Sequence, residues 1–211
     1  FKGLEKGHLK IGASTIPGEY ILPTIIGNFK NCYPGATLSM QIADTGAIVD
    51  MLLAGEIHLG ITGAKLKESK LVWQPFYKDE VVLIAGLGHP LAGKGSISLE
   101  ELKQQNFVAR EKTSGTWMVV EEKLHEVGLR SQDLNIIMEI GSTRAVITAV
   151  EAGLGLSWVS RLAVKDALQL GQVKELSVEG FSIERPLFLT HNKKKTLSPL
   201  AQEFIQYILN N

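Results

Sequence analysis

Hydroxyl side chains stand at three points of the sequence where a helix is expected to begin. These points are Ser14 and Thr15, then Thr113, Ser114, Gly115 and Thr116, and finally Ser142 and Thr143. The first backbone N–H groups of a helix lack partners inside the helix, and the helix dipole adds roughly half a positive charge at that end. Hydroxyl groups beside such N–H groups can hold a small anion. If the fold brings these positions together, they predict a site for a small anion or carboxylate.

A purely structural role is open for each of these residues. Serine and threonine are preferred helix caps, and Ser142 is the most ordinary cap among them. Gly115 favours binding, because a residue without Cβ lets the backbone approach a ligand closely. The cations Arg110, Lys112 and Arg144 lie nearby in sequence and would add positive field, but long cations equally face solvent. The choice between capping and ligand binding therefore stays open at this point.

Residues for catalysis or metal binding form no recognisable pattern. The five histidines are scattered, and none forms a metal-ligand pair at helical spacing. The sequence lacks the GxSxG motif of a hydrolase nucleophile. Cys32 follows the apolar face of the first expected helix and is expected to be a small core residue. We therefore expect no catalytic residue, no metal site and no cofactor, and an enzyme is disfavoured.

Composition and charge limit the classes of protein further. The 211 residues are 45% hydrophobic, with 22 Lys and Arg against 22 Asp and Glu, which excludes disorder and argues against a basic face for DNA. A single cysteine excludes a disulfide within the chain and fits a reducing compartment. No apolar run reaches the 18 residues of a membrane span. Because the chain begins at Phe1 without a signal-peptide pattern, we expect it to be a piece of a longer protein.

The elements that must position the hydroxyl groups alternate along the chain. Period-two apolar patterns predict strands near 8–13, 37–43, 57–61, 71–77, 81–85, 106–109, 134–140, 155–159, 173–176 and 183–189. Helical spacing predicts helices near 21–29, 48–53, 117–127, 146–150, 162–168 and 197–208. This alternation predicts an α/β fold with mainly parallel sheets. Ligands of such folds bind beyond the carboxyl ends of the strands, where the hydroxyl groups are expected.

One shift in composition occurs in the middle of the chain. Residues 86–95 contain four glycines and a proline, and the GxGxxG pattern of a phosphate loop fails at Leu91. We interpret this segment as a crossing from a first lobe into a second one. Two lobes with a ligand cleft between them are therefore expected.

The order of the segments resembles the effector-binding domain of LysR-type transcriptional regulators over essentially the full length. The residues that carry the resemblance are Leu9–Gly12, Leu22–Pro23 through Phe29 to Tyr33–Gly35, Leu53–Ile61, His89–Ala92, Ser98–Leu102, Val150–Leu156, and Leu197–Pro199 to Phe204. The family usually has an acidic residue where His58 stands. No single segment is specific, but all of them in this order are.

The resemblance implies two Rossmann-like subdomains of the type II periplasmic-binding-protein kind, joined by two crossovers near 86–89 and 184–188. Subdomain I would comprise residues 1–85 and 187–211, and subdomain II residues 86–186. A winged helix-turn-helix and a linker helix would precede Phe1 in the full protein. A cytoplasmic protein that contacts DNA only through that missing part is thus expected.

Arg110-Glu111 followed by Ser114–Thr116 looks like the branch that contains regulators of sulfur assimilation and carbon fixation. The resemblance implies that Ser14, Ser114, Thr116 and Thr143 hold a small, anionic effector, with Thr15 and Gly115 beside them. Ile16-Pro17 departs from the polar pair of some sulfate-responsive members. The family also implies a homodimer or homotetramer, in which residues 18–32 of one chain face a patch including 144–152 of another.

Two other classes of protein use the same architecture. An exported solute-binding protein of a transporter would bind its ligand in the same cleft without a DNA partner, and a signal peptide upstream of Phe1 would identify it. An enzyme would need a titratable residue in the cleft. The regulatory domain is the interpretation that we favour.

Overall fold

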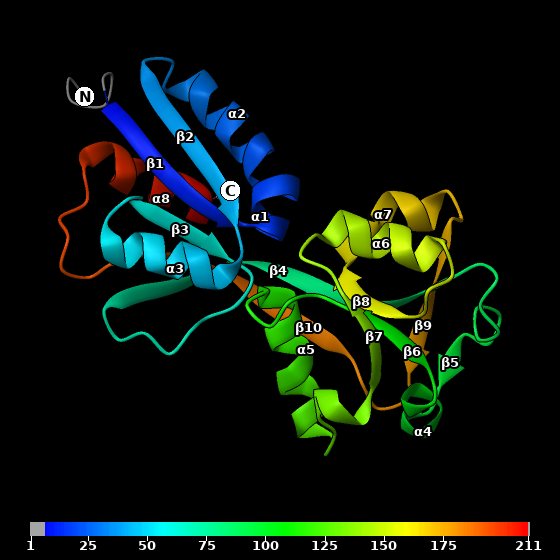
Figure 1. Ribbon diagram of the computed structural model, residues 1–211. Helices are drawn as coiled ribbons and strands as arrows, with labels where there is room; N and C mark the ends of the chain where they lie inside the picture. The colour runs from blue at the N-terminus through cyan, green and yellow to red at the C-terminus, as the bar shows by residue number, and fades with distance from the viewer. Residues whose placement is uncertain (1–6, 211) are drawn as a thin grey trace. The chain divides into compact units, whose positions relative to one another are not determined.

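The computed structural model describes residues 7–210, which form two compact units (Figure 1). Unit 1 comprises the chain up to Lys78 and again from Pro186, and unit 2 comprises Asp79–Arg185. The chain leaves unit 1 within strand β4 (Leu71–Gly86) and returns within strand β10 (Ile183–Asn192). Unit 1 is therefore built from two separate stretches of the sequence.

The boundaries expected from the sequence, 85/86 and 186/187, lie inside these two strands and stay a prediction. In the structure, the glycine-rich segment 86–95 follows the point at which the chain leaves unit 1. It lies within unit 2, where it connects β4 to the short strand β5 (Ser96–Ile97).

Unit 1 contains a sheet in which β1 is central. β1 (Gly7–Ser14) is parallel to β2 (Ala36–Ala43) on one side and to β3 (Leu59–Thr62) on the other, and β10 is antiparallel to β3. The helices of unit 1 are α1 (Thr15–Tyr20), α2 (Leu22–Cys32), α3 (Thr45–Ala54) and α8 (Pro199–Asn210). The three parallel strands end at the same edge, so the loops that follow them are neighbours.

The alternation of β1 explains how these helices cover the sheet. Leu9 and Ile11 face a cluster with Phe29 of α2 and Phe204 of α8, whose rings meet edge to face at 4.9 Å between centroids. Gly12 faces the opposite side, where a Cβ added to it would lie only 3.0 Å from Cδ1 of Ile48 in α3. A strand with period-two side chains therefore supports helices on both faces.

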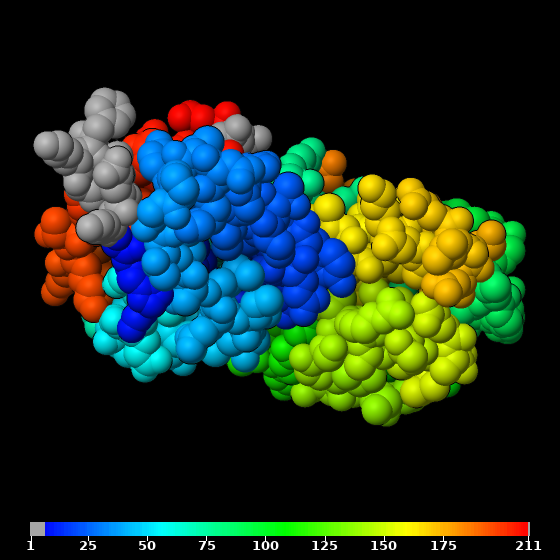
Figure 2. Space-filling view, turned by 90° about the horizontal axis from the view of Figure 1, so that it is seen from above, coloured from blue at the N-terminus to red at the C-terminus, as the bar shows by residue number. Residues whose placement is uncertain are grey.

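Unit 2 combines antiparallel and parallel pairing. β4 is antiparallel to β8 (Ser157–Ser160) and β9 (Val173–Val178), β5 is parallel to β9, and β6 (Asn106–Ala109) is parallel to β7 (Asn135–Glu139). The helices are α4 (Leu99–Lys103), α5 (Gly115–Glu126), α6 (Thr143–Glu151) and α7 (Arg161–Gln169), with a 3-10 turn at Ser131–Asp133. α6 and α7 lie side by side in both views (Figures 1 and 2).

The core of unit 2 has two parts, one on each face of β4. Leu83 faces the part with Trp117 of α5 and Trp158 of β8, whereas Val82 faces the part formed by α6 and α7. β6 joins this assembly through Leu156, which exchanges backbone hydrogen bonds of 2.8 and 2.9 Å with the residues flanking Phe107. This contact extends the parallel pair of β6 and β7 towards β8.

The expected α/β architecture is confirmed, with corrections in detail. The strand Asn106–Ala109 and the helix that carries Trp117 form as expected. The segments 71–77 and 81–85 form one continuous strand, β4, and the pairing is mixed and not mainly parallel. The prediction that Cys32 belongs to the core is wrong, because this last residue of α2 is exposed to solvent.

Candidate functional site

The hydroxyl group of Ser14 lies at the carboxyl end of β1 in unit 1. Its Oγ accepts a hydrogen bond of 2.9 Å from the backbone N–H of Gly63, which directly follows the neighbouring parallel strand β3. Ser14 is buried, and Thr15, the first residue of α1, is half-buried. Because Oγ acts only as an acceptor in this contact, the hydroxyl proton is available for a further acceptor.

Ser114, Gly115 and Thr116 begin helix α5 in unit 2, and all three are buried. The side chain of Ser114 makes no capping hydrogen bond to its own helix. Ser142 behaves differently, because its Oγ accepts a hydrogen bond from the N–H of Ala145, as expected of an ordinary cap. Helix capping therefore accounts for the place of Ser142 but not for that of Ser114.

Thr143 begins α6 and is joined to Arg110. Its Oγ1 accepts a hydrogen bond from Nη1 of Arg110, and both side chains are buried. Arg110 also donates to Glu111, from Nε to Oε2 at 2.8 Å and from Nη2 to Oε1 at 2.7 Å. Arg110 and Thr143 follow the parallel strands β6 and β7, so the fold brings them to one edge of that sheet. From the sequence, Arg110 could equally have faced solvent. In the structure it is buried at this edge and forms an ion pair with Glu111.

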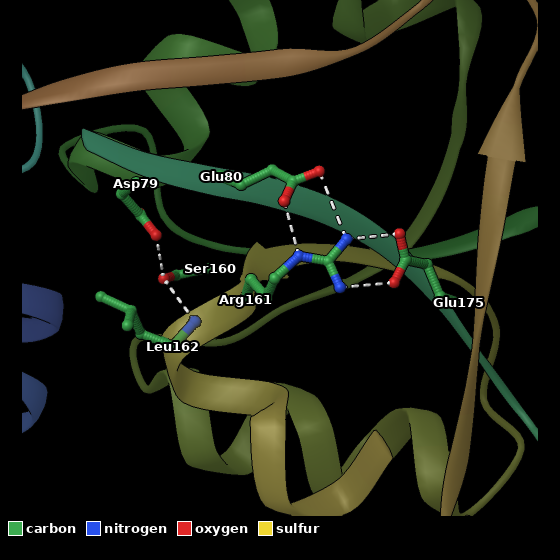
Figure 3. Close-up of polar contacts among 6 residues, drawn as sticks. All are labelled: Asp79, Glu80, Ser160, Arg161, Leu162 and Glu175. Atoms are coloured by element: carbon green, nitrogen blue, oxygen red, sulfur yellow. Dashed lines mark hydrogen bonds and ion pairs between the residues drawn. The ribbon is translucent and has the colours of Figure 1, made fainter. Parts of the chain in front are cut away.

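A second buried arginine of unit 2 lies against Asp79. Arg185 donates from Nε to Asp79 Oδ2 at 2.9 Å, and Ser160 donates from Oγ to Asp79 Oδ1 at 2.7 Å (Figure 3 shows the second contact). Burial lowers the pKa of Arg185, Asp79 opposes that shift, and the positive charge of Arg110 adds to it. The two guanidinium groups are thus close enough to repel each other, and each is held by its own carboxylate.

Arg161 forms the ion pairs that Figure 3 shows. Its guanidinium lies between Glu80 and Glu175, with Nε to Glu80 Oε2 and Nη2 to Glu175 Oε1 both at 2.6 Å. These hydrogen bonds raise the pKa of Arg161. The side chain of Arg161 is 41% exposed, so these ion pairs lie at the surface. They connect the first residue of α7 to β4 and β9, and we assign them a structural role.

The edge of unit 2 formed by the loops after β6 and β7 is suited to bind an oxyanion by hydrogen bonds. It combines the N-termini of α5 and α6 with hydroxyl groups and with a cation whose charge is already paired. Helix N-termini and hydroxyl donors stabilise an anion without a free cation. Among residues 7–210, no group of three His, Cys, Asp or Glu side chains could hold a metal ion.

Comparison with known proteins decides the family. A family model described as the LysR substrate binding domain matches residues 2–211. The chain belongs to this family. The type II periplasmic-binding-like α/β fold implied by the resemblance is confirmed, because the structural neighbours are LysR effector-binding domains.

Three relatives illustrate the range of similarity. A probable RuBisCO transcriptional regulator of Cyanidioschyzon merolae is 34% identical over 98% of this chain and 69% of that protein. A phosphonates import ATP-binding protein of Anaeromyxobacter dehalogenans is 36% identical over 95% of this chain but only 40% of that protein. The structure of the CcmR regulatory domain of Synechocystis PCC6803 in complex with 2-PG is 29% identical, with a TM-score of 0.87 and 97% of both chains covered.

The LysR substrate-binding domain described here spans 40% and 69% of the length of the two curated relatives. The regulator names among the relatives support the regulatory interpretation over an exported solute-binding protein. Within residues 7–210, no helix is both long and apolar enough to cross a membrane.

The fold brings some of the predicted site residues together. Arg110 and Thr143 are in direct contact, and Ser114, Gly115 and Thr116 share one helical turn. A role of Ser14, Thr15, Ser114, Gly115, Thr116 and Thr143 in effector binding stays a prediction. Sequence reasoning missed the network of Asp79, Ser160 and Arg185, because these residues are 25 to 106 positions apart and no local pattern links them.

Proposed function

We propose that this LysR substrate-binding domain senses a small anionic effector through the hydroxyl groups at the start of α5 and α6. The observation that carries the proposal is the buried edge of unit 2, where Arg110 holds Thr143 and Ser114 is not used as a helix cap. The prediction that Ser14 and Thr15 of unit 1 contact the same effector is part of the proposal. No residue of this edge is proposed to be catalytic.

The chemistry of the edge favours an anion with several oxygen atoms. Arg110 is neutralised by Glu111, so the attraction comes from the helix N-termini and hydroxyl donors and not from net formal charge. Binding of 2-PG is a property of the CcmR regulatory domain, whose fold this chain shares. By analogy, small phosphorylated or carboxylated anions form the proposed effector class, with inorganic sulfur oxyanions as the other members.

The proposed consequence of binding is regulation of transcription. An effector shifts a conformational equilibrium by as much as its affinities for the two states differ. In the full-length protein, that shift would be passed to a DNA-binding part outside this chain. We propose a cytoplasmic homodimer or homotetramer, with residues 18–32 and 144–152 at its contacts, and sedimentation equilibrium of the domain measures this state.

Exposed apolar residues support the proposed contact on unit 1. Tyr20 at the end of α1 is 37% exposed, and Ile42 on the edge strand β2 is 45% exposed. An edge strand that exposes apolar side chains offers a surface on which a second chain can pack.

Thermal unfolding tests the effector site. The panel comprises sulfate, sulfite, thiosulfate, phosphate, 2-PG and small carboxylates, at constant ionic strength. A ligand at 100 times its Kd adds about 2.7 kcal/mol to the free energy of unfolding, which for roughly 200 residues raises the Tm by about 5–10 °C. Thr116→Val should abolish the shift, because it replaces the buried hydroxyl with a methyl group of similar size.

Thr113→Val is the matched control, since Thr113 is exposed one residue before the proposed site. It should retain the full shift. A shift that Thr116→Val leaves unchanged would place the effector elsewhere, and a panel without any stabilising anion would contradict the anionic class.

A further inference from the structure

A cavity lies in unit 1, at the end of β1 opposite to Ser14. Its volume is about 270 Å³, and it is lined by the start of β1, by Ile57 and His58 before β3, and by residues 192 and 195–201. Figure 2 shows the loop after β10, in orange-red, beside the start of β1, in dark blue. His8 at this end is six residues from Ser14 along β1, which corresponds to about 20 Å. The cavity is therefore separate from the proposed effector site.

The titratable side chains that line the cavity are all basic. They are His8, His58 and Lys195, and no carboxylate is among the lining residues described. Burial lowers the pKa of His58 first, and the positive charges of Lys10, His8 and Lys195 lower it further. These three groups, two on β1 and one on the loop after β10, are the charged groups that act on His58. The positive field at the cavity disfavours one more cation and favours an anion.

The backbone of β1 fixes His58 for binding. The N–H of Lys10 donates to Nδ1 of His58 at 3.1 Å, and the N–H of His58 donates to the carbonyl of Lys10 at 2.8 Å. Because Nδ1 accepts a hydrogen bond, the proton of the neutral ring is on Nε2. The neutral ring of His58 therefore presents Nε2–H as a donor, and protonation of the ring would replace the hydrogen bond from Lys10 with a second N–H at Nδ1.

Two more residues with donor groups, Lys195 and Ser198, line the cavity. The ammonium group of Lys195 lies against Gly55, so closely that a Cβ on Gly55 would be 1.8 Å from Nζ, and among the described residues Lys195 forms no ion pair. Ser198 Oγ accepts a hydrogen bond of 3.2 Å from the N–H of Ala201 in the first turn of α8, which leaves its hydroxyl proton free to donate. The 12-residue helix α8 adds its dipole at the same point.

We propose that this cavity is a second binding site, for a small dianionic oxyanion of the phosphate class. His58 Nε2, Lys195 Nζ and the Ser198 hydroxyl are its donors. The ammonium charge of Lys195 and the charge of a protonated His58 ring oppose the two negative charges of such an anion. The site is independent of the effector proposed for unit 2, because it shares no residue with that edge.

The test is a titration of the domain with sodium phosphate, followed by NMR of the histidine ring signals, in a Thr116→Val background that removes the proposed effector site. Sodium chloride at equal ionic strength is the reference. We expect a saturable shift of the His58 signals and a higher His58 pKa in phosphate. If that pKa rises by about one unit, phosphate binds the protonated ring about tenfold more tightly than the neutral ring.

Two lysine variants make the test specific. Lys195→Ala should weaken phosphate binding by about tenfold or more, the usual loss for one charged hydrogen bond. Lys194→Ala is the matched control, because Lys194 is an exposed neighbour outside the cavity lining, and it should bind as the parent does. His58→Gln keeps a donor but cannot take up a proton, so its phosphate affinity should lose the part of the pH dependence that comes from the His58 ring, while the part that comes from the ionisation of phosphate itself stays.

Three results would overturn the proposal. They are a His58 shift no larger than that in sodium chloride, equal effects of the two lysine variants, and an unchanged His58 pKa in saturating phosphate. Because phosphate is also in the thermal-shift panel, a phosphate shift that survives Thr116→Val but is lost in Lys195→Ala belongs to this cavity. A shift that is lost in Thr116→Val belongs to the effector site, so the failures of the two proposals are distinguishable.

Discussion

Replacing Asp79 with asparagine isolates the charge of the buried ion pair in unit 2. Asparagine has nearly the same shape, but it removes the carboxylate charge that lies against Arg185. The guanidinium approaches Asp79 Oδ2 to 2.9 Å from Nε and 2.7 Å from Nη2, and the two side chains are 2% and 1% exposed. Removing one partner of such a pair costs roughly 3–5 kcal/mol, because the other charge stays buried and uncompensated. For a domain of roughly 200 residues this loss lowers the Tm by about 6–20 °C.

Thermal and urea unfolding, followed by circular dichroism, measure this loss. The matched control is the double variant Asp79→Asn with Arg185→Met, which removes both charges and should be more stable than Asp79→Asn alone. The argument is refuted if Asp79→Asn lies within about 1 kcal/mol of the parent protein, which is the range of an exposed ion pair. It is also refuted if the double variant is the less stable of the two.

Two further substitutions test the packing of unit 2. Gly155→Ala should lower the free energy of unfolding by about 1–3 kcal/mol, because Gly155 has a φ of 152° and its added Cβ would lie 2.4 Å from the carbonyl oxygen of Asn106. Urea unfolding measures this loss. Gly88→Ala is the control and should be neutral, because a Cβ on Gly88 meets open space. Arg161→Ala should cost less than about 1 kcal/mol despite its two carboxylate partners, because the guanidinium is partly exposed. That cost should shrink in high salt, and a loss that salt does not change would count against a surface ion pair.

The apolar pattern predicts a helix or strand well where the buried residues repeat with the period of that element. The bounds of β6 are those expected, and Trp117, Val120 and Leu124 line one buried side of α5. The continuity of β4 was not predictable in this way. The charged run Lys78-Asp79-Glu80 interrupts its apolar pattern and reads as a loop, yet a buried carboxylate is tolerated there because Arg185 lies against it.

The candidate site shows the same limit. The sequence places hydroxyl groups at the helix starts, since short polar residues before an apolar stripe are a local signal. It does not show that Ser142 caps its helix while Ser114 does not. The sequence also leaves Arg110 free to face solvent. Its contact with Thr143, 33 residues further along the chain, depends on the pairing of β6 with β7, which no local pattern shows.

The solvent-exposed thiol at the end of α2 has a practical consequence. Cys32 is the one cysteine of the sequence, and its side chain is accessible. A maleimide fluorophore would therefore attach at a single, known position without any substitution. Its emission would report changes in the surroundings of α2, the helix within the segment proposed to meet a second chain, so one labelled sample could follow self-association as its concentration is varied.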